Sequence, residues 1–146
     1  MSKSDVFENE LLLLIFNNTD IANIGDAAGL QNSATAGNLY LALHTADPGE
    51  AGTAVTNEIA YTGYARVAVP RTPAGFTVSG SSVTLTENED FPKMTGGTGG
   101  TVTHWSVVKE PSGPATILYS GEVDPDIIVA NGVTPRLEQA TSITED

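Results

Sequence analysis

Apolar and polar residues alternate with two different periods along the chain, and the first period is helical. Residues 5–17 contain no glycine or proline, and acidic residues gather near their start, as at the positive end of a helix dipole. Four apolar residues recur at the spacing of one helical face: Phe7, Leu11, Leu14 and Ile15. The sequence therefore predicts one N-terminal helix.

The second half of this helix is apolar on almost every side. Leu12, Leu13 and Phe16 lie off the stripe, so a single covering surface cannot bury all of these side chains. We expect the rest of the chain to cover one side of the helix and a neighbouring subunit to cover another. Leu12 and Phe16 are therefore predicted to bind a partner, together with the stripe.

Residues 18–37 are rich in Asn, Thr, Asp and Gly, which are residues typical of turns. This segment is predicted to form turns and short helical pieces, and to act as a connecting arm. Its part from Asp20 to Ala36 includes Ile21 and Ile24, which we add to the expected partner-binding residues. The helix and arm would form a first region, residues 1–37, and the second region would be a β domain, residues 38–146.

From residue 38 onward the period is close to two, which indicates strands. The fold class predicted is mainly β, an antiparallel sandwich or jelly roll with an N-terminal helix. Residues 39–44 are apolar on both faces, as expected of a central strand. Asp124-Pro125-Asp126 is interpreted as a turn between two strands, and Asn131-Gly132 is the strongest hairpin signal. The other strands are expected at 64–69, 76–79, 83–86, 101–109, 116–123, 127–130, 133–137 and 140–144.

The charge of the chain disfavours two classes of partner. Its 146 residues include 18 acidic and 6 basic side chains, a formal charge of −12. Such a surface repels the phosphates of nucleic acid and the headgroups of an anionic membrane. The apolar run from Leu11 to Phe16 is too short for a signal peptide or a membrane span. We expect synthesis in a host cytoplasm and neither nucleic acid nor membrane as a partner.

No pattern of residues indicates catalysis. His44 and His104 lie within predicted strands, and no serine has the surroundings of a nucleophile, so both histidines are interpreted as structural or interface residues. Glu87, Glu89 and Asp90 could contribute to a calcium loop, but they lack its spacing and are interpreted as a solvated acidic turn. We expect no enzyme activity, no cofactor and no metal.

The aromatic residues leave a binding role open. Trp105 is the one tryptophan, and its strand position favours the core. The alternative is a stacking platform of a carbohydrate-binding module. Such a platform would use Trp105, Phe76, Phe91, Tyr40 and Tyr119.

The order of several segments is similar to a known family. An acidic helix ending Leu-Leu-Leu-Leu-Ile-Phe precedes Leu39-Tyr-Leu-Ala-Leu-His-Thr-Ala-Asp-Pro-Gly and Glu58-Ile-Ala-Tyr-Thr-Gly-Tyr-Ala-Arg-Val-Ala-Val. Asp90-Phe-Pro, Thr101-Val-Thr-His-Trp-Ser-Val, Leu118-Tyr-Ser-Gly and Asn131-Gly-Val-Thr-Pro-Arg-Leu follow. The chain resembles, over nearly its whole length, a family of small tailed-bacteriophage virion proteins, described as tail fibre, structural or capsid decoration (cement) proteins.

This resemblance implies a part of the virion. The sequence has no repeats or heptads for a fibre shaft. The preferred expectation is therefore a capsid decoration protein on the outer capsid surface. It would form homotrimers, clamp the major capsid protein and stabilise the capsid, with the helix and arm as the gripping elements. A tail or tail-fibre component and a carbohydrate-binding module are the alternatives.

Overall fold

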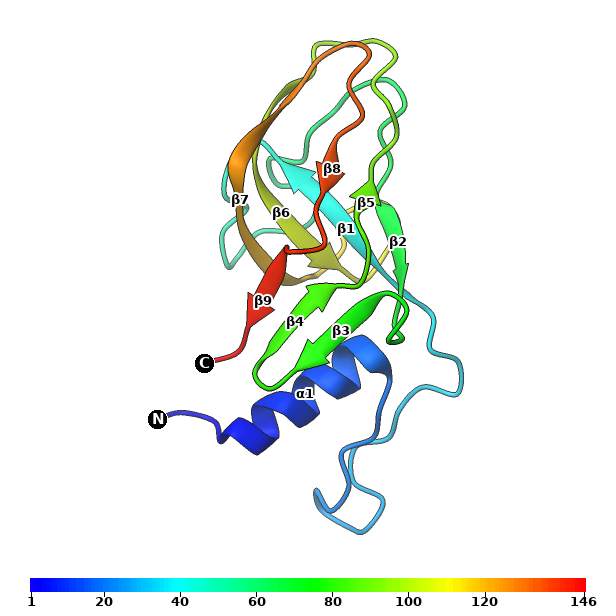
Figure 1. Cartoon of the computed structure of the whole chain (residues 1–146), viewed down its shortest axis with the longest axis vertical. Coiled ribbons are helices and arrows are strands. Elements are labelled where there is room, and N and C mark those ends of the chain that lie inside the picture. The colour runs from blue at the N-terminus through cyan, green and yellow to red at the C-terminus, as the bar shows by residue number, and fades with distance from the viewer. The chain divides into compact units, whose positions relative to one another are not determined.

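A computed structural model describes residues 1–146, the whole chain (Figure 1). It is mainly β, with antiparallel strand pairs and one N-terminal helix, which confirms the predicted fold class. No helix has the length and apolar content needed to cross a membrane. The elements are α1 (Asp5–Asn17), β1 (Asn38–His44), β2 (Val67–Pro70), β3 (Phe76–Ser79), β4 (Ser82–Leu85), β5 (Glu89–Asp90), β6 (Gly100–Val108), β7 (Ile117–Val129), β8 (Arg136–Leu137) and β9 (Ser142–Thr144).

The chain folds into two compact units. The first, here called the helical unit, comprises Met1–Asn38, Val69–Asn88 and Glu138–Asp146. The second, called the four-stranded unit, comprises Leu39–Ala68 and Glu89–Leu137. The chain first passes from the helical unit to the four-stranded unit between Asn38 and Leu39. The expected boundary, between residues 37 and 38, lies one residue earlier. The helix and arm share their unit with two later segments of the chain.

In the helical unit, α1 lies against the hairpin formed by β3 and β4 (Figure 1). The helix has the predicted bounds, and the Ser4 hydroxyl caps its start by accepting a hydrogen bond from the Phe7 amide at 3.4 Å. The predicted hairpin is confirmed, with its turn at Gly80, where φ is +59°. A third strand, β9, pairs with β4 and completes the sheet.

The arm, residues 18–37, contains no helix, so the predicted short helical pieces are wrong. Gly25, Gly29 and Gly37 all adopt positive φ angles, which interrupt any helical turn. The segment instead doubles back on itself through an isolated bridge between Ile21 and Leu30.

In the four-stranded unit, the strand order is β2-β1-β6-β7. β1 is a central strand, as predicted, and pairs with β6 in a register that sets Leu43 opposite Trp105. Leu41, Leu43 and Val107 on one face of the sheet are fully buried, and so are Ala42 and Ser106 on the other, as expected for strands covered on both faces. A separate pair, β5 with β8, completes the strands of this unit.

β2 is shorter than the predicted strand over residues 64–69, because only Val67–Pro70 is extended and paired. The Tyr64 amide donates to the Tyr61 carbonyl at 3.1 Å, which closes a turn just before the strand. Tyr64 and Arg66 thereby leave the sheet and contribute their side chains to hydrogen bonds among the loops.

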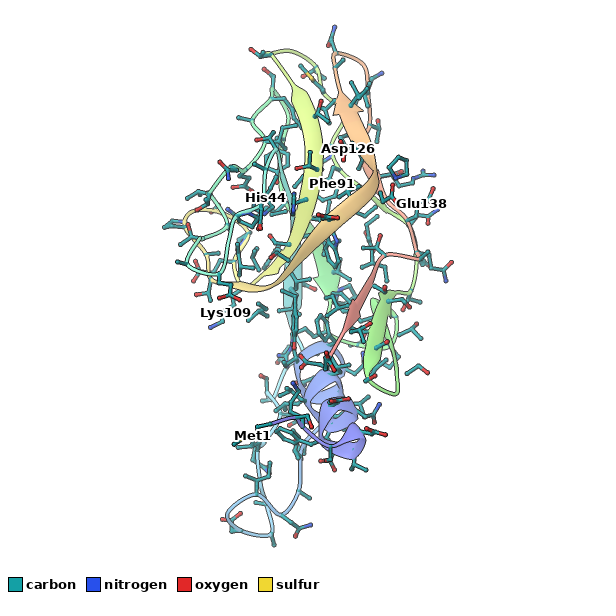
Figure 2. All side chains as sticks on the ribbon, turned by 90° about the vertical axis from the view of Figure 1, so that its left-hand side faces the viewer. Met1, His44, Phe91, Lys109, Asp126 and Glu138 are labelled. Carbon is teal, nitrogen blue, oxygen red and sulfur yellow. The ribbon has the colours of Figure 1, made fainter.

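Asp124-Pro125-Asp126 lies inside β7, so the predicted turn between two strands is wrong (Figure 2). β6 pairs with β7 on both sides of this segment, with Val102 opposite Ile127 and His104 opposite Glu122. Four residues of β7, 123–126, thus lie opposite the single residue Thr103 of β6, which makes a bulge in β7. A bulge with proline is tolerated because β7 is an edge strand.

The turn at Asn131-Gly132 forms, but the predicted hairpin is wrong. The Val133 amide donates to the Ala130 carbonyl at 2.9 Å, and Gly132 has φ of +90°. The chain that leaves the turn does not pair with β7. It runs beside the segment around β5, where the Phe91 amide donates to the Pro135 carbonyl at 2.8 Å and the Met94 amide to the Val133 carbonyl at 2.9 Å.

Candidate functional site

The expected partner-binding residues divide into buried and accessible groups. Leu12, Phe16 and Ile21 are at most 1% exposed, so they belong to the protein's own core. The other five keep accessible area: Phe7, Leu11, Leu14 and Ile15 are half-buried and Ile24 is 41% exposed. A partner can therefore reach only these five without rearrangement of the fold.

The fully buried side of α1 differs from the apolar stripe expected from the sequence. Glu8, Leu12 and Phe16, spaced by four residues, are the buried positions of the helix. The Phe16 ring meets the Phe76 ring edge to face, with centroids 4.9 Å apart, and so joins the helix to β3. The predicted stripe lies beside this contact and is only partly covered. A polar residue within the buried face, Glu8, concealed it from the hydrophobic pattern.

Arg71 holds the end of α1 to the end of the arm. Its guanidinium donates to the carbonyls of Leu14 at 2.8 Å, Ile15 at 2.7 Å and Ala36 at 3.2 Å. The last carbonyls of a helix have no partner within the helix, and they carry partial negative charge. Arg71 satisfies two of them with a cation, a role that its sequence context did not reveal.

The arm is an ordered loop held by its own side chains. Ile21 and Leu30 exchange backbone hydrogen bonds of 2.9 and 2.8 Å. Gly29 has φ of +67°, and a Cβ there would overlap the Ile21 carbonyl oxygen, so this position requires glycine. Asp26 Oδ1 accepts from the Ala28 and Gly29 amides at 2.9 and 3.1 Å. These contacts present Ile24 at the surface on a defined backbone.

The helical unit also carries most of the exposed large apolar side chains of the chain. Val6 on α1 is 68% exposed, and Leu30 on the arm is 43% exposed. The sequence pattern selected neither residue, because Val6 lies off the apolar stripe of the helix and Leu30 lies in a segment with no apolar periodicity. With Ile24 they form what we call the exposed apolar set: Val6, Ile24 and Leu30. Each of these exposed side chains gains free energy when a partner covers it, so the three are candidate contact positions.

A buried ion pair organises the loops of the four-stranded unit. Arg66 meets the Glu58 carboxylate through two hydrogen bonds of 2.8 Å, and its side chain is 3% exposed. The same guanidinium donates to the carbonyls of Glu110 at 3.1 Å and Gly113 at 2.7 Å. The hydrogen bond to Glu58 raises the pKa of Arg66. One cation thus joins two loops, residues 45–62 and 110–114.

Tyr64 extends this network to the sheet. Its hydroxyl donates to Glu58 Oε1 at 2.9 Å and accepts from the Leu43 amide at 3.1 Å. Burial raises the pKa of the Tyr64 hydroxyl, which stays protonated. Its ring also stacks on Phe91, with centroids 6.3 Å apart. Residues 63–66, Gly-Tyr-Ala-Arg, belong to the segments that resemble the family, and their Tyr64 and Arg66 side chains have an internal structural role.

His44 is fully buried, and both of its ring nitrogens have partners (Figure 2). Nδ1 lies 2.9 Å from the Thr56 carbonyl oxygen, which can only accept, so Nδ1 carries the proton. Nε2 then accepts from the Ser106 hydroxyl at 2.7 Å. Burial lowers the pKa of His44, which favours this neutral form. The arrangement fixes β1 to β6 and to the following loop.

Of the three residues expected in an acidic turn, Glu87 precedes and Glu89 and Asp90 form strand β5, so the prediction of a turn is wrong for the last two. Arg136 on β8 donates to both oxygens of Asp90 on β5, at 2.6 and 3.0 Å. These hydrogen bonds hold the pKa of Asp90 below its usual value. No three carboxylate or imidazole groups of the chain gather closely enough to hold a metal ion.

The aromatic platform considered above is not available at the surface. Trp105, Phe76 and Phe91 are at most 4% exposed, so their faces pack inside the protein. Tyr40 and Tyr119 are half-buried. A ring must expose its face to stack on a sugar, and these three buried rings cannot do so.

Comparison with known proteins gives one family. The chain matches the family described as podophage GP4 fiber I protein gp80 over residues 2–144, which is nearly its whole length. No curated protein matches it. The match confirms the expected relationship to phage virion structural proteins, while the decoration role stays a prediction. The chain belongs to the podophage GP4 fiber I protein gp80 family, and it is a structural protein of the phage virion.

Proposed function

We propose that this protein is a non-enzymatic building block of the virion, which attaches to other virion proteins through the exposed side of α1 and the arm. The observation that carries this proposal is the family match over residues 2–144. The accessible residues of the helical unit support the choice of surface, because Val6, Ile24 and Leu30 are exposed apolar side chains on ordered backbone. An apolar set of this kind gains free energy when a partner covers it.

The protein has two candidate positions in the virion. The first is a fibre component, because the matching family is described as a fiber protein. Capsid cement comes second. In that role homotrimers would sit on the outer capsid surface and clamp the major capsid protein. Support for cement comes from the sequence, which has no repeats or heptads for a shaft.

A non-enzymatic role agrees with how the polar residues of the interior are used. His44, Glu58 and Arg66 are engaged in hydrogen bonds that join loops and strands, and His44 is fully buried. The charge of −12 supports protein partners over nucleic acid or an anionic membrane. No cofactor or metal enters the proposal.

Copy number and location in purified virions separate the two positions. We expect a fibre component to be present in few copies on the tail, and its loss to abolish adsorption while heads stay intact. Cement would be present at a copy number comparable to that of the major capsid protein, and its loss would make heads fragile to heat. Quantitative gel densitometry and gold-labelled antibodies measure both properties. Absence of the protein from purified virions would refute the proposal as a whole.

The attachment surface can be tested with matched surface variants. In a phage that lacks the gene, plasmid-encoded V6D/I24D should fold but fail to enter particles, because charge is placed on the exposed apolar set. V55D is the control, since Val55 is 49% exposed on a loop of the four-stranded unit. Circular dichroism of the purified variants verifies folding. Normal incorporation of V6D/I24D would show that attachment uses another surface.

A further inference from the structure

The helical unit is strongly acidic, and both of its cations are already paired. Its residues include nine acidic side chains and two basic ones, a net charge of 2 − 9 = −7. The acidic residues are Asp5, Glu8, Glu10, Asp20, Asp26, Glu87, Glu138, Glu145 and Asp146. Lys3 lies 3.0 Å from Glu145 and donates to the Asp146 carbonyl at 2.8 Å. Arg71 donates hydrogen bonds to the carbonyls at the end of α1 and at the end of the arm.

Two of these carboxylates, Asp20 and Asp26, stand on the arm and precede and follow the exposed Ile24 in the sequence. Asp20 Oδ1 accepts from the Asn32 amide at 2.6 Å, and Asp26 Oδ1 accepts from the Ala28 and Gly29 amides. Each residue is exposed and is held in place through one oxygen, which leaves the other oxygen for a further contact. Ile24 lies between them in the chain. The arm thus presents an apolar side chain flanked by two fixed negative charges.

We propose that the arm and the exposed side of α1 dock on a basic surface of another virion protein, where lysine or arginine side chains surround an apolar depression. This inference rests on the proposed function and specifies the chemistry of the partner. Charge complementarity selects that partner. A second copy that used the same unit would bring −7 against −7, and like charges oppose such a contact. Both cationic side chains of the helical unit, Lys3 and Arg71, are already held by hydrogen bonds within the unit.

Neutral variants that preserve the fold of the arm test the role of charge. D20N/D26N removes two charges but keeps the Oδ1 acceptors that hold the arm. D47N/E50Q removes two charges from a loop of the four-stranded unit, and Asn at position 47 keeps the acceptor for the Gly49 amide. Each variant is expressed together with tagged wild-type protein during infection by phage that lack the gene. The measured quantity is the ratio of variant to wild type in purified particles, relative to that in the lysate.

We expect D20N/D26N to be under-represented about 5-fold, since each exposed ion pair contributes about 0.5 kcal/mol. D47N/E50Q should be incorporated like the wild type. If D20N/D26N is also incorporated normally while V6D/I24D is excluded, the basic partner is refuted and the attachment surface stands. If V6D/I24D is incorporated normally, the attachment surface itself is wrong.

A carbodiimide cross-link identifies the partner directly, because this reagent joins a carboxylate to a lysine amine in contact with it. In wild-type virions we expect peptides that contain Asp20 or Asp26 to be joined to lysines of a different virion protein. Cross-links to Lys93 or Lys109 of a second copy would overturn the proposal in favour of self-association. Absence of any cross-link from the arm, with other virion contacts captured, would also overturn it.

Discussion

Replacing Arg66 by methionine should strongly destabilise the four-stranded unit. The substitution keeps much of the apolar stem but removes the guanidinium that holds Glu58 and the carbonyls of Glu110 and Gly113. Glu58 would retain only the Tyr64 hydroxyl from the present network, although its side chain is 14% exposed. A carboxylate left without its cation in such a place carries an uncompensated cost of desolvation.

The magnitude follows from the burial of the pair. Removal of one partner from a buried ion pair costs about 3–5 kcal/mol. The exposed residues Glu110 and Gly113 can replace their lost hydrogen bonds with water, so they add little. A domain has a total stability of about 5–15 kcal/mol, so the loss is a large fraction of it. At about 2–4 °C per kcal/mol, the Tm should fall by about 6–20 °C.

Urea unfolding followed by the fluorescence of Trp105 provides the assay, because this single tryptophan is buried in the same unit as Arg66. R66K is the matched control for charge. It keeps the cation but cannot form two parallel hydrogen bonds, so its stability should lie between those of the wild type and R66M. A loss below about 1 kcal/mol for R66M would refute the view that this pair organises the loops.

Three further changes test other parts of the fold. F16A should cost about 3–5 kcal/mol in thermal unfolding because the ring is fully buried, whereas V6A should change stability by no more than about 0.5 kcal/mol. R71Q should accelerate amide hydrogen exchange in the arm and the last turn of α1, and R136Q, which breaks an exposed pair, should leave exchange there unchanged. Burial lowers the pKa of His44 below 6.5, so the unfolded chain binds a proton first and stability should fall as pH drops below 6.5. H44Q should remove that part of the decline in urea titrations.

The elements predicted best from the sequence depend on local information. The helix has its predicted bounds because residues 5–17 lack glycine and proline, and Asn18 then adopts a left-handed conformation that ends it. The central strand, β1, was recognisable because it is apolar on both faces. The hairpin around Gly80 was recognisable because its turn joins strands that pair with each other.

The errors arise where distant segments compete for the same partner. Asn131-Gly132 forms its turn, but the following residues pair with the segment around β5, which is distant in the sequence. The bulge at Pro125 was interpreted as a turn because the sequence does not reveal that both flanks pair with β6. Arg66 and Arg71 were missed because they bind backbone carbonyls, and a carbonyl acceptor has no sequence signature.

Only part of the candidate site was predicted, because burial and exposure depend on contacts between distant segments. Hydrophobic periodicity located the apolar helix but not its buried side, because Glu8 occupies one of the three buried positions. The pattern also missed Val6, which lies off the apolar stripe, and Leu30, which lies in a segment with no apolar periodicity. Exposure of an isolated apolar side chain depends on tertiary structure, so these positions could be identified only from the fold.

The loops and strands of the four-stranded unit and the arm proposed for attachment are stabilised by different contacts. His44, Glu58, Tyr64 and Arg66 lie in the former, and their side chains are consumed by hydrogen bonds within the four-stranded unit. Substitution of any of them lowers the stability of the fold, whatever its effect on partner binding. The arm is stabilised mainly by its own turns and by Arg71, which binds only backbone carbonyls and one serine hydroxyl there. Exposed side chains such as that of Ile24 can therefore change without loss of those contacts. Substitutions at Ile24 should therefore affect attachment with little effect on the stability of the fold.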